Sequence, residues 1–305
     1  MRANRIGSHV IPLDMTSEAA TPGFFESVEE CTECEFFLEG STRGLLAGLG
    51  DGGRAGHLVD LACGVGEPGL SLLRAGYAGR LTGIDTSPQL IEAARQRAAD
   101  EGFAADAHFV VGDMDALEFA DASVDAVVSR MGALLLGDPA RTAREIGRIL
   151  VPGGRFSIAA WAEMERHPIM VLTHDALLTC VSADQVPDLS GWFRQMATPG
   201  VRSGWMHAAG LSAVEVEPFE WACHFPDFES CWSLGRTIWR SAMTSLDDGG
   251  VRRVRSALQE ALQPWQTAFG DGYVITTTCQ IVSGERPGQG EGTEMPRRAP
   301  RPNRL

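Results

Sequence analysis

An acid and two spaced glycines stand between two apolar runs in the stretch HLVDLACGVGEPGLSLL, residues 57–73. The runs are typical of a strand followed by a helix, which places Gly64 and Gly66 in the turn, where a ligand can approach the backbone. A dinucleotide phosphate would bind at the start of that helix. Glu67 stands there, however, and Asp60 ends the strand. Two acids repel a phosphate and attract a sulfonium or an ammonium group, so this turn favours a cationic cofactor over NAD.

Two further acids end later β-type runs. Asp85 closes LTGID, 19 positions after Gly66, where a carboxylate can accept hydrogen bonds from both ribose hydroxyls. Alone, it fits NAD as well as S-adenosylmethionine (SAM). Asp113, followed by Met114, closes FVVGD and could accept from an adenine amino group. The alternative, that Asp113 only caps a turn, stays open.

Strand-like and helical patterns alternate between residues 57 and 161. The strands are predicted at 57–62, 80–85, 107–113, 124–130 and 154–161, and the helices at 68–76, 87–102 and 139–150. Ser87 is a typical helix cap, with Pro88 at the first helical position. This alternation predicts a parallel sheet with helices on both faces and ligands at the carboxyl ends of its strands.

The regular alternation of strand-like and helical patterns ends after residue 161. A helix is predicted near 199–209, and strands at 213–219 and 273–282, with an insertion at 219–270 between them. Apolar residues recur there at helical spacing: Phe228, Cys231, Trp232, Gly235, Ile238, Trp239 and Met243. One interpretation is a helix that packs on the core, and the other is a lid in which Trp232 or Trp239 contacts a substrate.

Composition excludes several kinds of partner. The net charge of −14 and the absence of a basic patch argue against nucleic acid and anionic membranes. The chain has no lysine, which is typical of a GC-rich genome. Its seven cysteines indicate reduced, buried thiols, and Cys31 and Cys34 lack the second pair that a metal site needs. No signal peptide or membrane span is evident, so we expect a soluble, cytoplasmic monomer or homodimer without a metal.

Three stretches together resemble the class I SAM-dependent methyltransferases, in the branch that includes the ubiquinone and menaquinone biosynthesis enzymes. They are VDLACGVGEP, GIDTSPQLIEAARQRA and the run from VVGDMDALEF to GRFSIAAW, and the resemblance covers residues 57–161. It implies an α/β, Rossmann-like, seven-stranded and mostly parallel sheet with helices on both faces. A helical cap would come from the N-terminus and from the 219–270 insertion.

The same resemblance assigns the cofactor site. The cofactor-binding residues that it implies are Asp60, Ala62, Gly64, Gly66, Asp85, Thr86, Asp113, Met114, Ser129 and Arg130. The loop from Asp60 to Gly66 would hold the methionine part, Asp85 the ribose, and Asp113 with Met114 the adenine. Ala62 departs from the family, which usually has glycine there. Ser129 and Arg130 would face the reactive methyl group and the acceptor, beside Met131 as a candidate substrate contact.

Methyl transfer needs alignment and exclusion of water, and some acceptors also need a general base. His167, in ERHPIM, is the candidate catalytic base, and the alternative is a capping or surface role. Aromatic residues after the core favour a small, largely apolar acceptor: Trp192, Phe193, Trp205, Trp221, Trp232 and Trp239. The sequence thus predicts O-, N- or C-methylation, with natural-product tailoring as the expected role. The alternative is a SAM-binding protein with cyclase-like or pure binding activity.

The chain divides into five expected segments. They are a flexible start (1–14), N-terminal cap helices (15–56), a SAM-binding core (57–161), the remaining core with substrate-cap insertions (162–283) and a disordered tail (284–305). The tail is rich in Gly, Pro and Arg without apolar periodicity, which is typical of disorder.

Deleting residues 287–305 should leave the melting temperature and the SAM affinity nearly unchanged, because this segment has almost nothing to bury. Differential scanning fluorimetry with and without SAM measures both. A fall of several degrees in the truncated protein would show that the tail docks on the fold.

Overall fold

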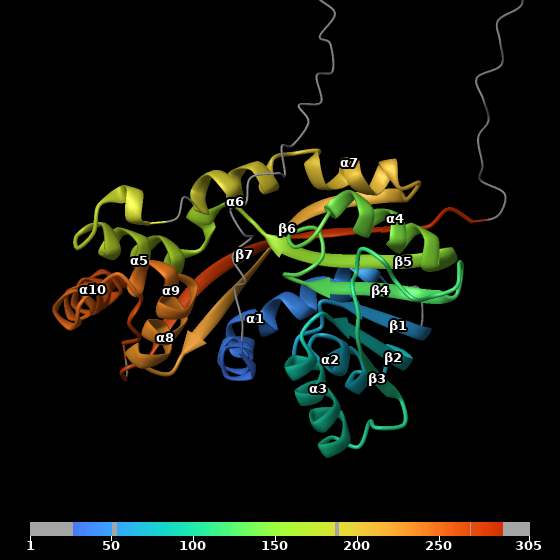
Figure 1. Cartoon of the computed structure of the whole chain (residues 1–305), viewed down its shortest axis with the longest axis horizontal. Helices are drawn as coiled ribbons and strands as arrows, with labels where there is room; N and C mark the ends of the chain where they lie inside the picture. Colours follow the sequence, from blue (N-terminus) through green and yellow to red (C-terminus); the bar gives the residue numbers. More distant parts are fainter. Residues whose placement is uncertain (1–26, 51–53, 187–188, 269, 289–305) are drawn as a thin grey trace, which may run out of the picture.

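The computed structural model describes residues 27–50, 54–186, 189–268 and 270–288. The expectations for residues 1–14 and for most of the tail lie outside these ranges. One sheet runs through the molecule in the order β3-β2-β1-β4-β5-β7-β6 (Figure 1). Its strands are β1 Ala55–Leu61, β2 Ala78–Asp85, β3 Ala107–Val111, β4 Val124–Arg130, β5 Leu150–Trp161, β6 Ser212–Phe225 and β7 Tyr273–Glu285.

The sheet is parallel except for β7. Strand β1 pairs parallel with β2 and β4, β2 with β3, and β4 with β5. Strand β7 runs antiparallel between β5 and β6, with Trp161 opposite Cys279. This arrangement confirms the predicted α/β, Rossmann-like, seven-stranded and mostly parallel sheet.

Helices cover both faces of the sheet. They are α1 Val28–Leu49, α2 Gly69–Arg74, α3 Pro88–Asp100, α4 Pro139–Ile149, α5 Pro168–Leu178, α6 Leu189–Ala197, α7 Val201–Ala208, α8 Phe228–Ile238, α9 Arg240–Met243 and α10 Asp248–Ala261. Figure 1 shows α4 and α7 on one face and α1, α2 and α3 on the other. Caps begin them as the sequence predicts: the Ser87 hydroxyl accepts from the Leu90 N–H, and Pro88 is the first residue of α3.

The last two strands are longer than expected. Strand β6 continues to Phe225, so residues 219–225 belong to the sheet and the insertion begins only afterwards. Strand β7 continues to Glu285, where it pairs with Arg155 and Ser212, two residues into the segment for which composition predicts disorder. Backbone pairing stabilises these residues, and composition does not report it.

Helix α1 lies directly on the sheet through three glycines one helical turn apart. A Cβ at Gly40 would lie 2.1 Å from the Trp221 ring, and one at Gly44 would lie 2.9 Å from Ile281. At Gly48 it would lie 2.5 Å from the Ser157 hydroxyl. No side chain fits at these positions, so the backbone of this half of α1 packs against β5, β6 and β7 at close range.

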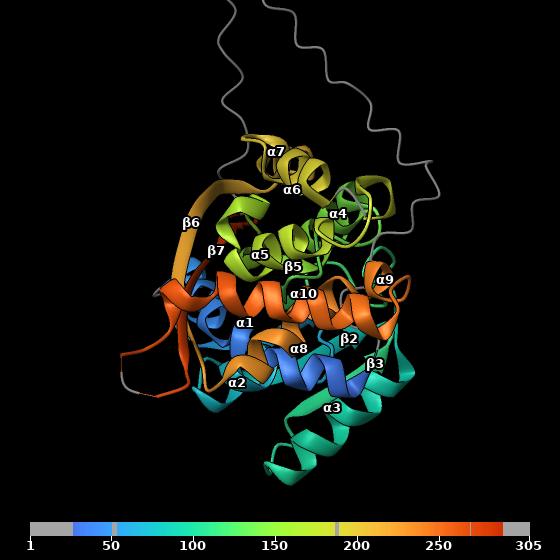
Figure 2. The same cartoon turned by 90° about the vertical axis from the view of Figure 1, so that its left-hand side faces the viewer.

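The apolar stripe of the insertion packs inside a group of helices. Figure 2 shows α5 and α10 side by side with α8 next to them. The Trp239 indole is 1% exposed and donates to the Met170 carbonyl at 3.0 Å. The buried Trp232 ring lies 5.8 Å from the Arg255 guanidinium. A Cβ at Gly235 would meet Thr173 at 2.5 Å, so α8 and α5 are in tight contact. Both tryptophans therefore belong to the core of this group.

Trp239→Ala should lower the free energy of unfolding by roughly 3–5 kcal/mol, because it removes a fully buried ring and its hydrogen bond. Urea unfolding followed by circular dichroism measures the change. The control Arg236→Ala, on the exposed side of α8, should change stability by less than about 0.5 kcal/mol. Equal stability of Trp239→Ala and wild type would contradict the core assignment.

Candidate functional site

A cleft with a cavity volume of about 140 Å³ opens at the carboxyl ends of β1, β2 and β4. Its floor comes from the loops after these strands, and α1 forms its roof. The residues that line it are Cys31, Glu35 and Leu38 of α1, Ala62–Val65 and Glu67 after β1, Asp85 and Leu90, Arg130–Gly132 and Leu136 after β4, and Trp161. The cleft thus lies where the sequence predicted a ligand, at the carboxyl ends of the parallel strands.

The two glycines of the loop after β1 have different structural roles. Gly64 has φ +53°, and an added Cβ would meet nothing closer than the Cys31 sulfur at 4.0 Å. Gly66 has φ +100°, but its Cβ would lie 2.8 Å from Leu70 and 3.3 Å from Phe109. Only Gly64 thus presents open backbone to the cleft, whereas Gly66 allows the loop to pack against the protein itself.

The loops after β1 and β4 touch at their tightest bends. Ala62 has φ +54° and Met131 φ +60°, in a region that side chains rarely adopt. The Ala62 methyl lies 2.3 Å from the position of a Cβ on Gly132, so that position must be glycine. Strained backbone of this kind concentrates at ligand sites. Ala62, which departs from the family glycine, is accommodated by Gly132.

Asp60 lies beneath the cleft and does not line it. Its side chain is fully buried, and Oδ2 accepts from the Gly69 N–H at 2.8 Å, at the start of α2. Oδ1 has no hydrogen-bond partner among the described residues. Burial raises the pKa of Asp60 to about 8, and the nearby carboxylates of Glu67 and Asp85 act in the same direction. The residue therefore holds the loop from behind and keeps one oxygen unpaired.

Asp85 lines the cleft and joins two loops. Its Oδ2 accepts from the Gly64 N–H at 3.0 Å, and Oδ1 from the Ser87 N–H at 2.9 Å. Each carboxylate oxygen can accept a second hydrogen bond, so acceptor capacity is left for a ligand. Thr86, beside it, is exposed and does not line the cleft.

Three other residues assigned by resemblance lie off the cleft. Asp113 accepts from the Asp115 N–H at 2.8 Å, which is the turn-capping contact left open above, and Met114 is buried in an apolar cluster. Ser129 is fully buried, donates to the Leu61 carbonyl at 2.7 Å and accepts from the Ala133 N–H at 2.8 Å. Ser129 thus fixes the loop after β4 to the end of β1.

The candidate base His167 lies behind the wall of the cleft. Its ring is 1% exposed, its edge contacts Trp161 at 5.0 Å between centroids, and Nδ1 lies 2.7 Å from the Thr277 hydroxyl. Burial lowers the pKa of His167 to about 3, so the imidazole is neutral near pH 7. Among the described residues, His167 reaches the cleft only through the Trp161 ring. Trp232 and Trp239 do not line it.

Helix α1 supplies the residues that sequence reasoning missed. Cys31, Glu35 and Leu38 follow one another at spacings of four and three, so one face of the helix presents all three to the cleft. This face could have been recognised from the spacing. Glu35 pairs with Arg97 of α3 at 2.7 Å, and Arg97 also contacts Glu67 at 3.2 Å. The roof is therefore tied to the floor across the edge of the cleft.

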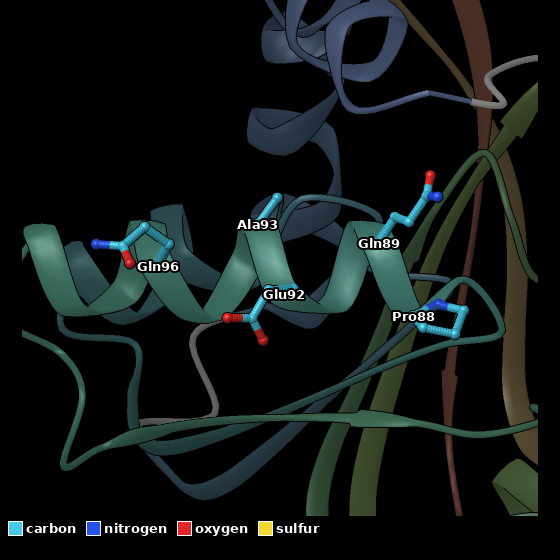
Figure 3. A pocket seen from close by; sticks show the side chains of 5 residues that line it. All are labelled: Pro88, Gln89, Glu92, Ala93 and Gln96. Carbon is cyan, nitrogen blue, oxygen red and sulfur yellow. The ribbon is translucent and has the colours of Figure 1, made fainter.

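A second depression lies on the exposed face of α3 (Figure 3). Its residues are Pro88, Gln89, Glu92, Ala93 and Gln96, all from this one helix. It has no opposing wall, and no buried polar group points into it. This depression is therefore no enclosed site.

The described residues contain no group of three side chains arranged to hold a metal ion. Cys31 and Cys34 are free thiols, and burial together with nearby carboxylates raises the pKa of Cys31 to about 12. A thiol of that pKa is a weak nucleophile at neutral pH. In this part of the chain, no helix is both long and apolar enough to cross a bilayer.

The low pKa of His167 makes stability depend on pH. The folded state keeps the imidazole neutral while the unfolded state binds a proton below about pH 6.5, so stability should fall as pH drops from 6.5 toward 3. His167→Gln should remove up to about 1.4 kcal/mol of this loss per pH unit. The raised pKa of Asp60 acts oppositely, so we compare variant and wild type at each pH by urea unfolding. Parallel curves would contradict the buried neutral state.

Residues 59–158 match a family model described as a methyltransferase domain. An uncharacterized protein of Mycobacterium tuberculosis is 30% identical over 186 residues, which are 60% of this chain and 64% of that protein. A ubiquinone/menaquinone biosynthesis C-methyltransferase of Methylobacterium nodulans is 28% identical over 168 residues, which are 52% of this chain and 66% of that enzyme. The chain therefore spans slightly less than two thirds of the length of these relatives.

A solved structure, the YcgJ protein of Bacillus subtilis, has the same fold. Its TM-score is 0.51 at 19% identity, and the alignment covers 81% of this chain and 98% of that one. At this identity the likeness concerns the fold. Residues 59–158 match a methyltransferase domain, and they lie in a seven-stranded sheet of order 3-2-1-4-5-7-6.

Proposed function

We propose that this chain binds SAM in the cleft under α1 and transfers its methyl group to a small, largely apolar acceptor. One observation carries the proposal: a single cleft combines the open backbone of Gly64 and the Asp85 carboxylate with an apolar wall formed by Leu38, Leu136 and Trp161. When bound, SAM supplies an intrinsically reactive methyl group on a sulfonium.

The residues of the cleft fit the cofactor. Gly64 leaves the backbone open, and Asp85 has unused acceptor capacity for ribose hydroxyls. Glu67 and Asp85 line the cleft, which suits a molecule with a sulfonium and an ammonium group. This supports the cofactor roles of the first loop and of Asp85.

The remaining assigned roles are weaker parts of the proposal. Asp113 and Met114 could contact adenine only if the cleft extends toward the end of β3 when the cofactor binds. Ser129 acts on the loop that it holds and has no direct contact with the cleft. Thr86 is a neighbour of the ribose position on the exposed side.

The acceptor would lie between α1 and the loop after β4. Leu38, Met131, Leu136 and Trp161 exclude water there, which supports Met131 as a substrate contact. In this proposal α1 is the roof, and Trp232 and Trp239 stabilise the helices behind it. His167 acts by positioning Trp161, because the histidine is neutral and enclosed. Natural-product tailoring rests on composition alone and stays a prediction.

Release of S-adenosylhomocysteine tests the activity directly. The protein is incubated with SAM and a panel of small phenols, enols and amines, and the by-product is quantified by mass spectrometry. We expect release that depends on one acceptor class. Tight SAM binding without release over the whole panel would instead favour the non-methylating alternative.

Asp85→Ala should weaken SAM binding more than about tenfold, since ribose hydroxyls lose a charged acceptor worth roughly 1.5–3 kcal/mol per bond. Asp85→Asn keeps an acceptor for the Gly64 N–H and should show a smaller loss. Asp106→Ala removes an exposed acid remote from the cleft and is the matched control. Calorimetry that finds unchanged affinity in folded Asp85→Ala would refute the ribose assignment.

A further inference from the structure

Arg130 has few partners for a guanidinium inside a cleft. It ends β4, lines the cleft, and its Nη1 donates to the Thr42 hydroxyl of α1 at 3.3 Å. Within the described ranges it makes no ion pair, since no carboxylate oxygen lies within 4.0 Å of its nitrogens. A guanidinium has five N–H donors, so most of them are left for a ligand.

Two other partly or fully buried arginines have more hydrogen-bond or ion-pair partners within the protein. Arg97 contacts the carboxylates of Glu35, Glu67 and Glu101, and Arg202 donates to the Trp161 carbonyl at 2.8 Å. Arg130, by contrast, has a single acceptor among the described residues, the Thr42 hydroxyl, and it lines the cleft.

The acids around Arg130 do not neutralise its charge. Glu35 and Glu67 are both engaged by Arg97 at 2.7 and 3.2 Å. Asp85 accepts two backbone N–H groups on the other side of the cleft. Asp60 is buried with a pKa of about 8, so it is largely protonated at neutral pH. Arg130 thus contributes a net positive charge, although acids outnumber bases in this region.

We propose that Arg130 is the oxyanion anchor of the cleft, where its planar fork binds a carboxylate of the bound molecule. The inference rests on the proposed function and adds a chemical requirement to it. Two parallel N–H···O bonds from a guanidinium match the planar geometry of a carboxylate. The neighbouring Met131, Leu136 and Trp161 keep water away and strengthen this contact.

Two molecules could bring this carboxylate: the cofactor, through its amino-acid part, or an acidic acceptor. Calorimetry distinguishes them with wild type, Arg130→Met, Arg130→Lys and the control Arg141→Met, an exposed arginine of α4. The cofactor probes are SAM and decarboxylated SAM. The acceptor probes are benzoate and benzyl alcohol, each titrated into the protein with and without saturating S-adenosylhomocysteine.

If the anchor holds the cofactor, Arg130→Met should lower the affinity for SAM at least about tenfold and leave the affinity for decarboxylated SAM unchanged. If it holds the acceptor, SAM should bind normally and benzoate should lose its advantage over benzyl alcohol. Arg130→Lys keeps the positive charge but not the planar fork, so its affinity should lie between those of wild type and Arg130→Met. Arg141→Met should match wild type in every titration.

Folded Arg130→Met that binds SAM and benzoate as wild type does would overturn the anchor. Should that variant fail to fold, the wild type alone decides: equal affinity for SAM and decarboxylated SAM, together with equal affinity for benzoate and benzyl alcohol, overturns the proposal. If wild type binds neither SAM nor decarboxylated SAM, the proposed function is refuted instead. The benzoate titration without S-adenosylhomocysteine still tests the anchor in that case.

Discussion

The hydrogen bond from the Gly64 N–H to Asp85 joins the loops that follow β1 and β2, and the geometry of the cleft depends on it. It holds Gly64 in its left-handed conformation with the open face toward the ligand. Ser129 makes a corresponding connection between Leu61 and Ala133, so the loop after β4 is fixed to the same strand end. Polar side chains at the ends of two parallel strands, β2 and β4, thus hold the loops after β1, β2 and β4 together.

Much of this framework could be predicted from residue patterns. Alternating β-type and helical runs, with caps such as Ser87, give the parallel core, because these signals are local. The position of β7 between β5 and β6 was not predicted, since periodicity does not report which strands are neighbours. Asp85 lies at the cleft because it ends its strand at the carboxyl edge of the sheet, and its contact with ribose stays a prediction.

Other residues show where such reasoning fails. The position of Asp60 is equally compatible with a ligand contact and with a cap for α2, and only packing decides between them. Trp232 and Trp239 form an apolar stripe, but a stripe shows that one face is buried and not what buries it. The resemblance predicted an N-terminal helical cap, but the ion pair between Glu35 and Arg97 joins residues far apart in sequence, and local patterns do not contain it.

The two halves of α1 are attached by different forces. Close backbone packing at Gly40, Gly44 and Gly48 is insensitive to salt, because it involves shape and apolar contact. Toward the other end, half-exposed ion pairs hold the helix, from Glu35 to Arg97 and from Glu30 to Arg240, and dissolved ions screen them. Ionic strength therefore acts on the ion pairs near the start of α1 and leaves the glycine packing near its end unchanged.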